Sequence, residues 1–573
     1  MPLIVVNMTP QSLSGEQNQD SEPQIAVNPS NPREIVGSAF TPDPAGGPLA
    51  PVYVSEDAGL TWALCPIIPG GNSFSGTGDV TVRFADSGTF YAADLRGDAF
   101  LHMNVLRGGT FFPASAMTVV YDRPTNVDQP YIQAMTVATT DRVFVGANDG
   151  TGIAKRQSSA EHSINAGTAP APANFSTTVL ESRASAGPGD GPSARPAIHS
   201  DGTVYMAYLA WRAWTGATST TDVVICRDDN WGTGANPFGN LVDAADGLRG
   251  NRIATGLVIN WFSPTIGQER VGSDLAIAVD PNDSGSVYIA WADNAGGPYT
   301  LHVRHSTDRG VTWHGDIRTV TNAKNPGLAV SSDGRLGFLF QQVTGVAPNQ
   351  RWVTTLELTS NDWVGPAEVH VLATVPSDTP AATFLPYIGD YVCLQALGRH
   401  FYGVFCANNT PDHANFPSGV RYQRNADFTT HVLHDVDNVT PVAVSIDPFF
   451  FHYSPRLKWH KELKPEIKER KELIKPEIKF ERKEKIELKE NLKQEIDVKG
   501  RKELIKEKDK DLIEGGGKGL AEGDPYILLG KLAERVDQLE EELASGHAFI
   551  RPEERPELGG NIPKPEPPSE SSS

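Results

Sequence analysis

Several apolar segments of this chain begin with a charged or amide side chain, and these side chains are the first candidates for chemistry. They are Glu22, Asp79, Asp128, Gln129, Arg195, Asp274 and Asp390. If the segments surround one axis, the carboxylates repel one another and something must offset the repulsion. Ca²⁺ held by Asp79, Asp128, Asp274 and Asp390 would do so, as would Arg195, Arg270 or raised carboxyl pKa values. In the alternative interpretation these carboxylates cap loops and face water.

The segments that carry these residues recur along the chain. Seven copies of a short apolar strand, a turn rich in Gly, Asp, Asn or Pro, and a second apolar strand start at Pro23, Asp79, Pro130, Arg195, Asp274, Pro326 and Pro386. Their spacing leaves room for two outer strands in each unit. Four strands repeated seven times predict an all-β, seven-bladed β-propeller. A six-bladed ring and a tandem of β-sandwiches are the alternatives. The stretch Leu3–Asn7 is expected to close the ring as an outer strand of the last blade.

An eight-residue pattern, Ser-x-Asp-x-Gly-x-Thr-Trp, occurs twice, from Ser55 to Trp62 and from Ser306 to Trp313. The aspartates, Asp57 and Asp308, can accept hydrogen bonds from backbone amides in a tight turn. Gly59 and Gly310 allow the positive φ that such a turn needs. Trp62 and Trp313 are expected to begin the returning strand and to bury apolar area. Degraded copies lie around Asp228 with Trp231 and around Asn361 with Trp363.

These octets resemble the Asp-box of the sialidase-like (BNR-repeat) β-propellers, over roughly residues 20 to 440. The resemblance implies the propeller fold and raises a glycosidase activity, which in that family uses an arginine triad, a Tyr nucleophile paired with a Glu, and an Asp as acid/base. The family's Arg-Ile-Pro motif is absent, since the first strand "PQIAV" has no arginine. The residues available for such a site are Arg195, Arg270, Asp128 and Tyr131, but they do not form the family's constellation.

Of the four cysteines, Cys393 and Cys406 flank one predicted hairpin, "YVCLQALGRHFYGVFC". A two-residue loop at Arg399-His400 would place them opposite each other, within the reach of a disulfide. Cys65 and Cys226 are expected to be unpaired.

The net charge of −20 argues against binding to nucleic acid. No apolar run is long enough for a transmembrane helix. The first residues lack a basic segment and a long apolar core, so no ordinary signal peptide is expected. The sequence therefore predicts a cytoplasmic protein or one exported by a non-classical route.

The composition changes after the seventh repeat. Residues 1–450 are expected to form the propeller and residues 451–524 a Lys/Glu-rich spacer that ends in a glycine-rich break. Residues 525–546 have a heptad stripe of Leu529, Leu532, Val536, Leu539 and Leu543, which predicts a short coiled-coil-like helix. Residues 547–573 are proline-rich and expected to be extended. The segment from 525 to 573 is expected to support self-association or the docking of a partner.

Three functions are compatible with these features. The favoured one is a propeller that binds a carbohydrate or a protein through the funnel at its axis. The alternatives are a diverged sialidase-like exo-glycosidase, and a structural component or cargo of an assembly similar to a phage tail or injection system.

Overall fold

The computed structural model describes residues 3–455 except 18, 42–47, 70–78, 97–101, 124–126, 150–156, 168–172, 185–193, 261–274, 296 and 381–387. The chain divides into two units, Met1–Leu457 and Lys458–Ser573. All that follows concerns the first unit. The predicted spacer from residue 456 onward, the heptad stripe and the proline-rich tail lie outside the described residues.

The described residues form seven four-stranded antiparallel sheets, which we call blades 1 to 7. Blade 1 contains β2 (Gln24–Val27), β3 (Ile35–Ser38), β4 (Leu49–Ser55) and β5 (Ala63–Pro69). Blade 2 contains β6 (Val80–Phe84), β7 (Phe90–Arg96), β8 (His102–Arg107) and β9 (Thr118–Arg123). Blade 3 contains β10 (Val127–Val137), β11 (Thr140–Asp149), β12 (Gln157–Ser163) and β13 (Ser176–Val179). Blade 4 contains β14 (Arg195–Ile198), β15 (Val204–Trp214), β16 (Thr218–Asp228) and β17 (Asn251–Asn260).

Blade 5 contains β18 (Leu275–Asp280), β19 (Asp283–Asp293), β20 (Thr300–Ser306) and β21 (Arg318–Thr321). Blade 6 contains β22 (Ala323–Val330), β23 (Leu336–Thr344), β24 (Arg351–Thr359) and β25 (Glu368–Pro376). Blade 7 contains β26 (Cys393–Leu397), β27 (His400–Asn408), β31 (Ile446–Tyr453) and β1 (Leu3–Asn7). An insertion in blade 7 carries η3 (His413–Asn415) and the small sheet of β28 (Asn425–Asp427), β29 (Val432–His434) and β30 (Pro441–Val442). A further short helix, η1 (Gln11–Leu13), follows β1.

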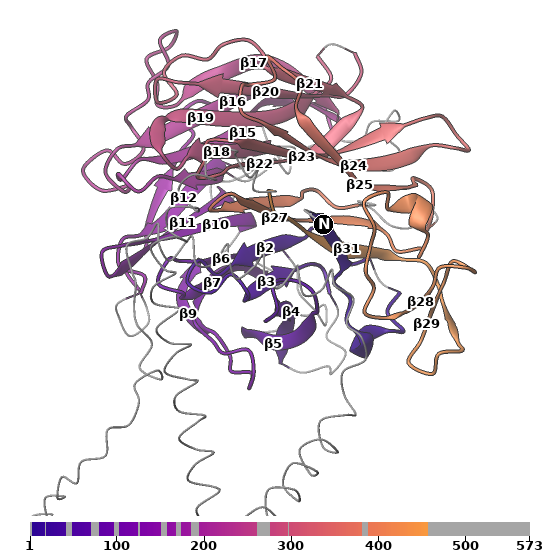
Figure 1. The fold of residues 1–573 in the computed structure, drawn as a ribbon. Helices are drawn as coiled ribbons and strands as arrows, with labels where there is room; N and C mark the ends of the chain where they lie inside the picture. Colours follow the sequence, from indigo (N-terminus) through magenta and orange to yellow (C-terminus); the bar gives the residue numbers. More distant parts are fainter. Residues whose placement is uncertain are drawn as a thin grey trace, which may run out of the picture. The chain divides into compact units, whose positions relative to one another are not determined.

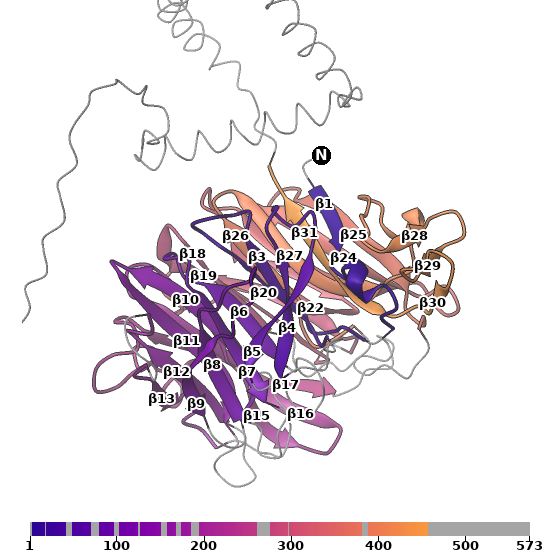
Figure 2. The ribbon, with the colours of Figure 1, turned by 90° about the horizontal axis from the view of Figure 1, so that it is seen from below.

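The first strands of the seven blades form a closed ring. Contacts run from β2 to β6, β10, β14, β18, β22 and β26, and from β26 back to β2. Figures 1 and 2 show the blades following one another in sequence order until the orange strands lie beside indigo β1. The predicted seven-bladed propeller is therefore confirmed, and the six-bladed ring and the tandem of sandwiches are wrong.

The ring is closed by strands from both ends of the first unit. β1 pairs antiparallel with β31, with Leu3 opposite Tyr453 and Asn7 opposite Phe449. This is the closure predicted for Leu3–Asn7. Because β31 extends to Tyr453, the propeller ends slightly beyond the predicted boundary at residue 450.

Both octets fold into the same turn between the third and fourth strands of their blades. In the first, Ser55 Oγ accepts a bond from the amide of Gly59 (2.9 Å), and Asp57 Oδ1 accepts one from the amide of Thr61 (2.9 Å). The indole N–H of Trp62 donates to the Gly59 carbonyl (3.1 Å). The second octet makes the corresponding bonds through Ser306, Asp308, Gly310 and Trp313. Both glycines have the positive φ that the turn requires. Trp62 is buried, whereas Trp313 is only partly buried.

The predicted disulfide between Cys393 and Cys406 is wrong. The hairpin turns at Gly398-Arg399 instead of Arg399-His400, so Cys393 lies opposite Val404. Gly398 has a φ of 57°, and a tight two-residue hairpin turn favours glycine at such a position. The two sulfurs are separate thiols that face the backbone carbonyls of Ile25 and Asp20. Cys65 and Cys226 are free as well.

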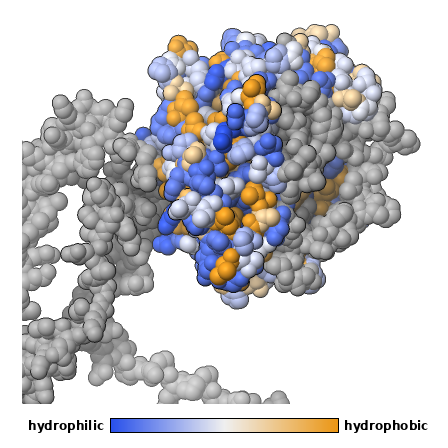
Figure 3. All heavy atoms as spheres, turned by 90° about the vertical axis from the view of Figure 1, so that its right-hand side faces the viewer, coloured by the Kyte–Doolittle hydropathy of each residue, from blue (hydrophilic) through white to orange (hydrophobic). Residues whose placement is uncertain are grey.

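Large apolar side chains that are exposed at the surface include Val346, Val364 and Val439. Figure 3 shows hydrophobic residues interspersed with hydrophilic ones on one face. No helix among the described residues is long and apolar enough to cross a membrane.

A histidine in the closing strand makes stability depend on pH. His452 stacks on Tyr402 (4.3 Å between ring centroids), and its Nε2 lies 2.9 Å from Nδ1 of His400. Burial and the neighbouring His400 lower the pKa of His452 to about 3. Since an unfolded histidine takes up its proton near pH 6.5, only the unfolded chain gains this proton as the pH falls below that value. We expect the free energy of unfolding to fall by up to about 1.4 kcal/mol per pH unit between about pH 6 and pH 4.

Urea unfolding of the full chain across this range measures the slope. His452→Phe keeps the stacking and should flatten it, whereas the control His314→Phe, at an exposed position, should leave it unchanged. Equal slopes for all three proteins would contradict the assignment.

Candidate functional site

Three residues at the starts of inner strands hold an unusual backbone conformation: Glu22 just before β2, Gln129 in β10 and Asn325 in β22. Glu22, Gln129 and Asn325 have φ values of 57°, 48° and 55°, are buried, and each precedes a proline. The strand register shifts at two of these places, between Asp128 and Tyr131 and between Lys324 and Gly327. Strained non-glycine residues and bulges of this kind cluster at functional sites, where they aim side chains. Glu22, Gln129 and Asn325 mark one end of the central axis of the ring. We call this end of the axis the funnel.

At the funnel a buried guanidinium stands between two tyrosines. Arg195 Cζ lies 4.2 Å from the ring centroid of Tyr131 and 5.8 Å from that of Tyr391. The two rings meet edge to face, with centroids 6.4 Å apart. The hydroxyl of Tyr391 donates to Asp79 Oδ1 at 3.0 Å. Side chains from blades 2, 3, 4 and 7 therefore form one cluster, which fixes the orientation of each member.

A short loop before β26 is held by residues from the strained positions. Gln129 Nε2 donates to Asp390 Oδ2 (3.3 Å), and the carbonyl of Gly389 accepts from Lys324 Nζ (3.0 Å) and Asn325 Nδ2 (3.1 Å). Since Asp390 and Tyr391 follow Gly389 directly, these hydrogen bonds position the side chains of Asp390 and Tyr391 at the funnel.

The carboxylates at the funnel are offset by buried cations. Two buried cations, Arg195 and Lys324, lie at the funnel end of the ring. The carboxylates at the same end are those of Glu22, Asp79, Asp128 and Asp390. No group of three or more His, Cys, Asp or Glu side chains in the described part of the chain is arranged to hold a metal ion. Asp274 and Arg270 lie outside the described residues. Because Asp274, one of the four predicted ligands, is not described, the Ca²⁺ site stays a prediction.

Burial governs the protonation of the aromatic hydroxyls. It raises the pKa of Tyr131 to about 12, with a further contribution from Cys393 and opposition from Arg195. Burial, then Asp79 and Glu22, raise the pKa of Tyr391 well above its usual value. Burial also lowers the pKa of Arg195. Both phenols are thus protonated at neutral pH, and Tyr391 acts as a hydrogen-bond donor to Asp79 rather than as a phenolate.

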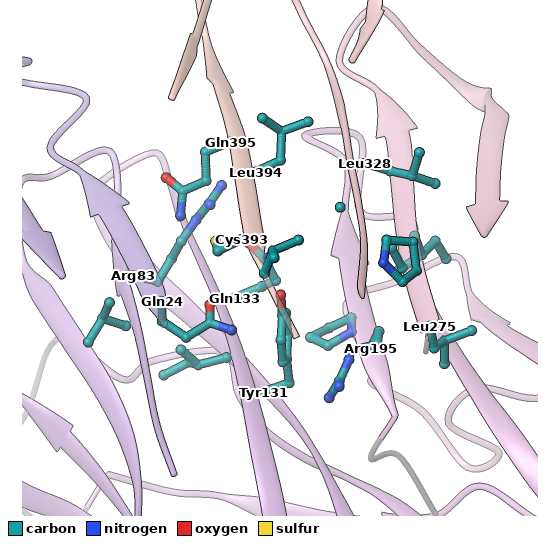
Figure 4. A pocket seen from close by; sticks show the side chains of 18 residues that line it. Gln24, Arg83, Tyr131, Gln133, Arg195, Leu275, Leu328, Cys393, Leu394 and Gln395 are labelled. Carbon is teal, nitrogen blue, oxygen red and sulfur yellow. The ribbon is translucent and has the colours of Figure 1, made fainter. Parts of the chain in front are cut away.

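Below the cluster the axis narrows to a cavity of about 50 Å³, lined by Arg83, Tyr131 and Arg195 among others. Figure 4 shows these three side chains together with Gln24, Gln133, Cys393 and Gln395 around it. A larger cavity of about 460 Å³ continues toward the opposite end and shares Arg83, Gln133 and Gln395 with the first. The small cavity holds little more than one or two water molecules.

The predicted residues Glu22, Asp79, Asp128, Gln129, Arg195 and Asp390 all lie at the funnel end of the ring, with Tyr131 beside Arg195. Sequence reasoning missed Tyr391, Lys324 and Asn325 as members of the site. The sequence did contain a signal for Asn325. A polar residue followed by proline recurs near the start of an inner strand, at Glu22-Pro23, Gln129-Pro130 and Asn325-Pro326.

No protein-family model matches the chain, and no curated protein matches it in sequence. An α-L-arabinofuranosidase from Fusarium graminearum is 11% identical, covering 77% of this chain and 97% of its own, with a TM-score of 0.32. A polysaccharide lyase, the PL25 ulvan lyase, is 12% identical, covering 68% and 92%, with a TM-score of 0.38.

Sqt1 from Chaetomium thermophilum is 13% identical, covering 70% of this chain and 81% of its own, with a TM-score of 0.35. Similarity at this level says nothing about activity, because one fold carries many functions. The assignment as a seven-bladed propeller therefore rests on the seven sheets and the closed ring of inner strands.

Proposed function

We propose that the funnel is a binding site for a carbohydrate. The observation that carries the proposal is the cluster of Arg195, Tyr131, Tyr391 and Asp79, which combines aromatic rings with fixed hydrogen-bond donors and acceptors at one end of the axis. Ligand sites in proteins typically join a few positioned polar groups to apolar and aromatic surface. Sugar hydroxyls both donate and accept, so they suit a funnel that offers carboxylates, amides and cations together.

Binding of the full chain to neutral, uronic-acid and sialic-acid oligosaccharides tests the proposal. At least one class should bind, and Arg195→Gln and Tyr391→Phe should each weaken that binding at least about tenfold, the effect of losing one charge-assisted or buried hydrogen bond. Arg142→Gln is the matched control, because Arg142 lies at the same 4.2 Å from the ring of Trp231, between blades 3 and 4. Binding to none of the classes, or binding that survives both funnel variants, would overturn the proposal.

The second candidate function is hydrolysis by a diverged sialidase-like glycosidase. It is favoured by one observation, the 3.0 Å hydrogen bond from Tyr391 to Asp79, since a nucleophile and its base stand within such a distance. The raised pKa of Tyr391 favours the binding function, because a protonated phenol donates a hydrogen bond and is a poor nucleophile. Turnover of aryl glycosides by the full chain, lost in Tyr391→Phe, would favour hydrolysis. A structural role through the tail rests on residues outside the described part of the chain.

A further inference from the structure

Three side chains away from the funnel form a hydrogen-bonded row of serine, histidine and aspartate, which we call the blade 5 triad. Ser286 Oγ lies 2.9 Å from His305 Nε2. His305 Nδ1 lies 2.7 Å from Asp362 Oδ2. These are the contacts by which a histidine can take the proton of a serine while a carboxylate fixes its orientation.

The sheet register explains why the first two members meet. Tyr288 of β19 lies opposite His305 of β20, and Ser286 is two residues before Tyr288. Side chains two residues apart on a strand point to the same face, so Ser286, Tyr288 and His305 share one face of blade 5. Tyr288 stacks on His305, with ring centroids 3.9 Å apart, and donates to Asp362 Oδ1 (3.2 Å). The tyrosine thus fixes both the imidazole and the carboxylate.

The aspartate comes from the neighbouring blade. Asp362 follows β24 of blade 6, in the degraded octet that begins at Thr359. Asp362 occupies the fourth position of this octet and has a φ of 53°. In the two complete octets the fourth position is occupied by Ala58 and Arg309, with φ values of 64° and 63°. The same turn that fastens a hairpin elsewhere therefore presents a carboxylate to His305 here.

The electrostatics of the row suit a histidine base. Burial raises the pKa of Asp362, but the hydrogen bond and charge of His305 outweigh this, so that its pKa is lowered and it stays ionised. An ionised Asp362 accepts the Nδ1–H of His305, which leaves Nε2 free to accept the proton of Ser286.

The low solvent exposure of the three side chains restricts the size of the substrate. Ser286 is 9% exposed, and the side chains of His305 and Asp362 are 13% and 31% exposed. This low exposure of the serine favours a small acyl group. The triad also lies away from the funnel: Leu275, at the funnel end of β18, pairs with Trp291, whereas Ser286 lies near the hairpin at the other end of β19.

The competing explanation for the blade 5 triad is a purely structural contact that joins two blades. At the junction of blades 4 and 5, Arg309 reaches Thr203 and Asp229 from the same octet position. That bridge contains no histidine that could take a proton from a hydroxyl group. The two explanations differ in whether Ser286 reacts.

We infer that Ser286, His305 and Asp362 form a nucleophilic site for small carboxylic esters, such as acetyl esters. Ser286 Oγ forms a bond to the acyl carbon as its proton passes to His305 Nε2. The bond from the acyl carbon to the leaving alkoxide breaks, and His305 returns the proton to give the free alcohol. Water then gives a proton to His305 Nε2 as its oxygen bonds to the acyl carbon. The bond from the acyl carbon to Ser286 Oγ breaks, His305 returns the proton to Ser286 Oγ, and the free acid leaves.

The experiment exposes the full chain to a fluorophosphonate and to p-nitrophenyl acetate, and maps the modified residue by peptide mass spectrometry. Both should modify Ser286, and Ser286→Ala should abolish the modification. Asp362→Asn should slow it by about 10²–10⁴-fold, because the wrong imidazole tautomer then faces the serine. Ser284→Ala is the matched control: Ser284 lies on the same strand but bonds to Asp201, and its loss should change nothing.

Absence of an adduct at Ser286, or an adduct that forms equally fast in Asp362→Asn, would overturn the inference in favour of a purely structural contact. Thermal melting checks that each variant is folded, and His305→Gln replaces Asp362→Asn if that variant unfolds. The modification is measured without any oligosaccharide, so the outcome is independent of the proposal for the funnel.

Discussion

Replacing Asp447 with Ala is expected to destabilise the propeller by about 3–5 kcal/mol, the cost of leaving a buried charge without its partner. Asp447 and Arg424 are completely buried and form an ion pair. Asp447 also accepts from Asn7 Nδ2 (2.7 Å), Asn409 Nδ2 (2.8 Å) and Ser445 Oγ (3.0 Å). It therefore joins the first strand, the insertion and the last strand at the point where the ring closes.

Urea unfolding of the full chain measures this loss. Asp437→Ala is the control, because Asp437 bonds to a turn in the same insertion but is exposed, and its loss should have little effect. A loss below about 1 kcal/mol for Asp447→Ala would show that the buried pair contributes no more than a surface ion pair.

Replacing Gly389 with Ala is expected to weaken ligand binding at the funnel at least about tenfold, the scale of losing one buried hydrogen bond, and to lower the melting temperature. Gly389 has a φ of 84°, and a Cβ there would lie 2.6 Å from the backbone nitrogen of Glu22. Since that contact is to backbone, the loop must move. Asp390 and Tyr391 follow it directly, so their bonds to Gln129 and Asp79 are disrupted.

Gly419→Ala separates this clash from backbone strain. Gly419 has nearly the same φ, 85°, but nothing lies within 4 Å of its added Cβ. Both variants carry the conformational cost of alanine at positive φ, so only Gly389→Ala should affect binding, measured with the oligosaccharide that binds the unaltered chain. Equal effects of the two variants would contradict a positioning role for Gly389.

The sequence by itself determined the repeating part of this protein. Strand pairs, the turns between them and the two octets depend on alternation, glycine and short-range hydrogen bonds, all of which are visible within about 20 residues. Counting the pairs predicted seven blades, and the apolar stretch before the first pair predicted the closing strand β1. The same reasoning placed Glu22, Asp79, Asp128, Gln129, Arg195 and Asp390 at one end of the ring, because every inner strand starts there.

The tertiary structure alone decided which side chains meet. The hairpin of Cys393 turns one residue earlier than predicted, because Gly398 takes the positive φ, and this places Val404 instead of Cys406 opposite Cys393. Tyr391 reaches Asp79 and Lys324 reaches Gly389 across distant parts of the sequence. Asp362 likewise meets His305 only because consecutive blades pack face to face. Such meetings depend on the register and packing of whole blades, and no local pattern of residues encodes them.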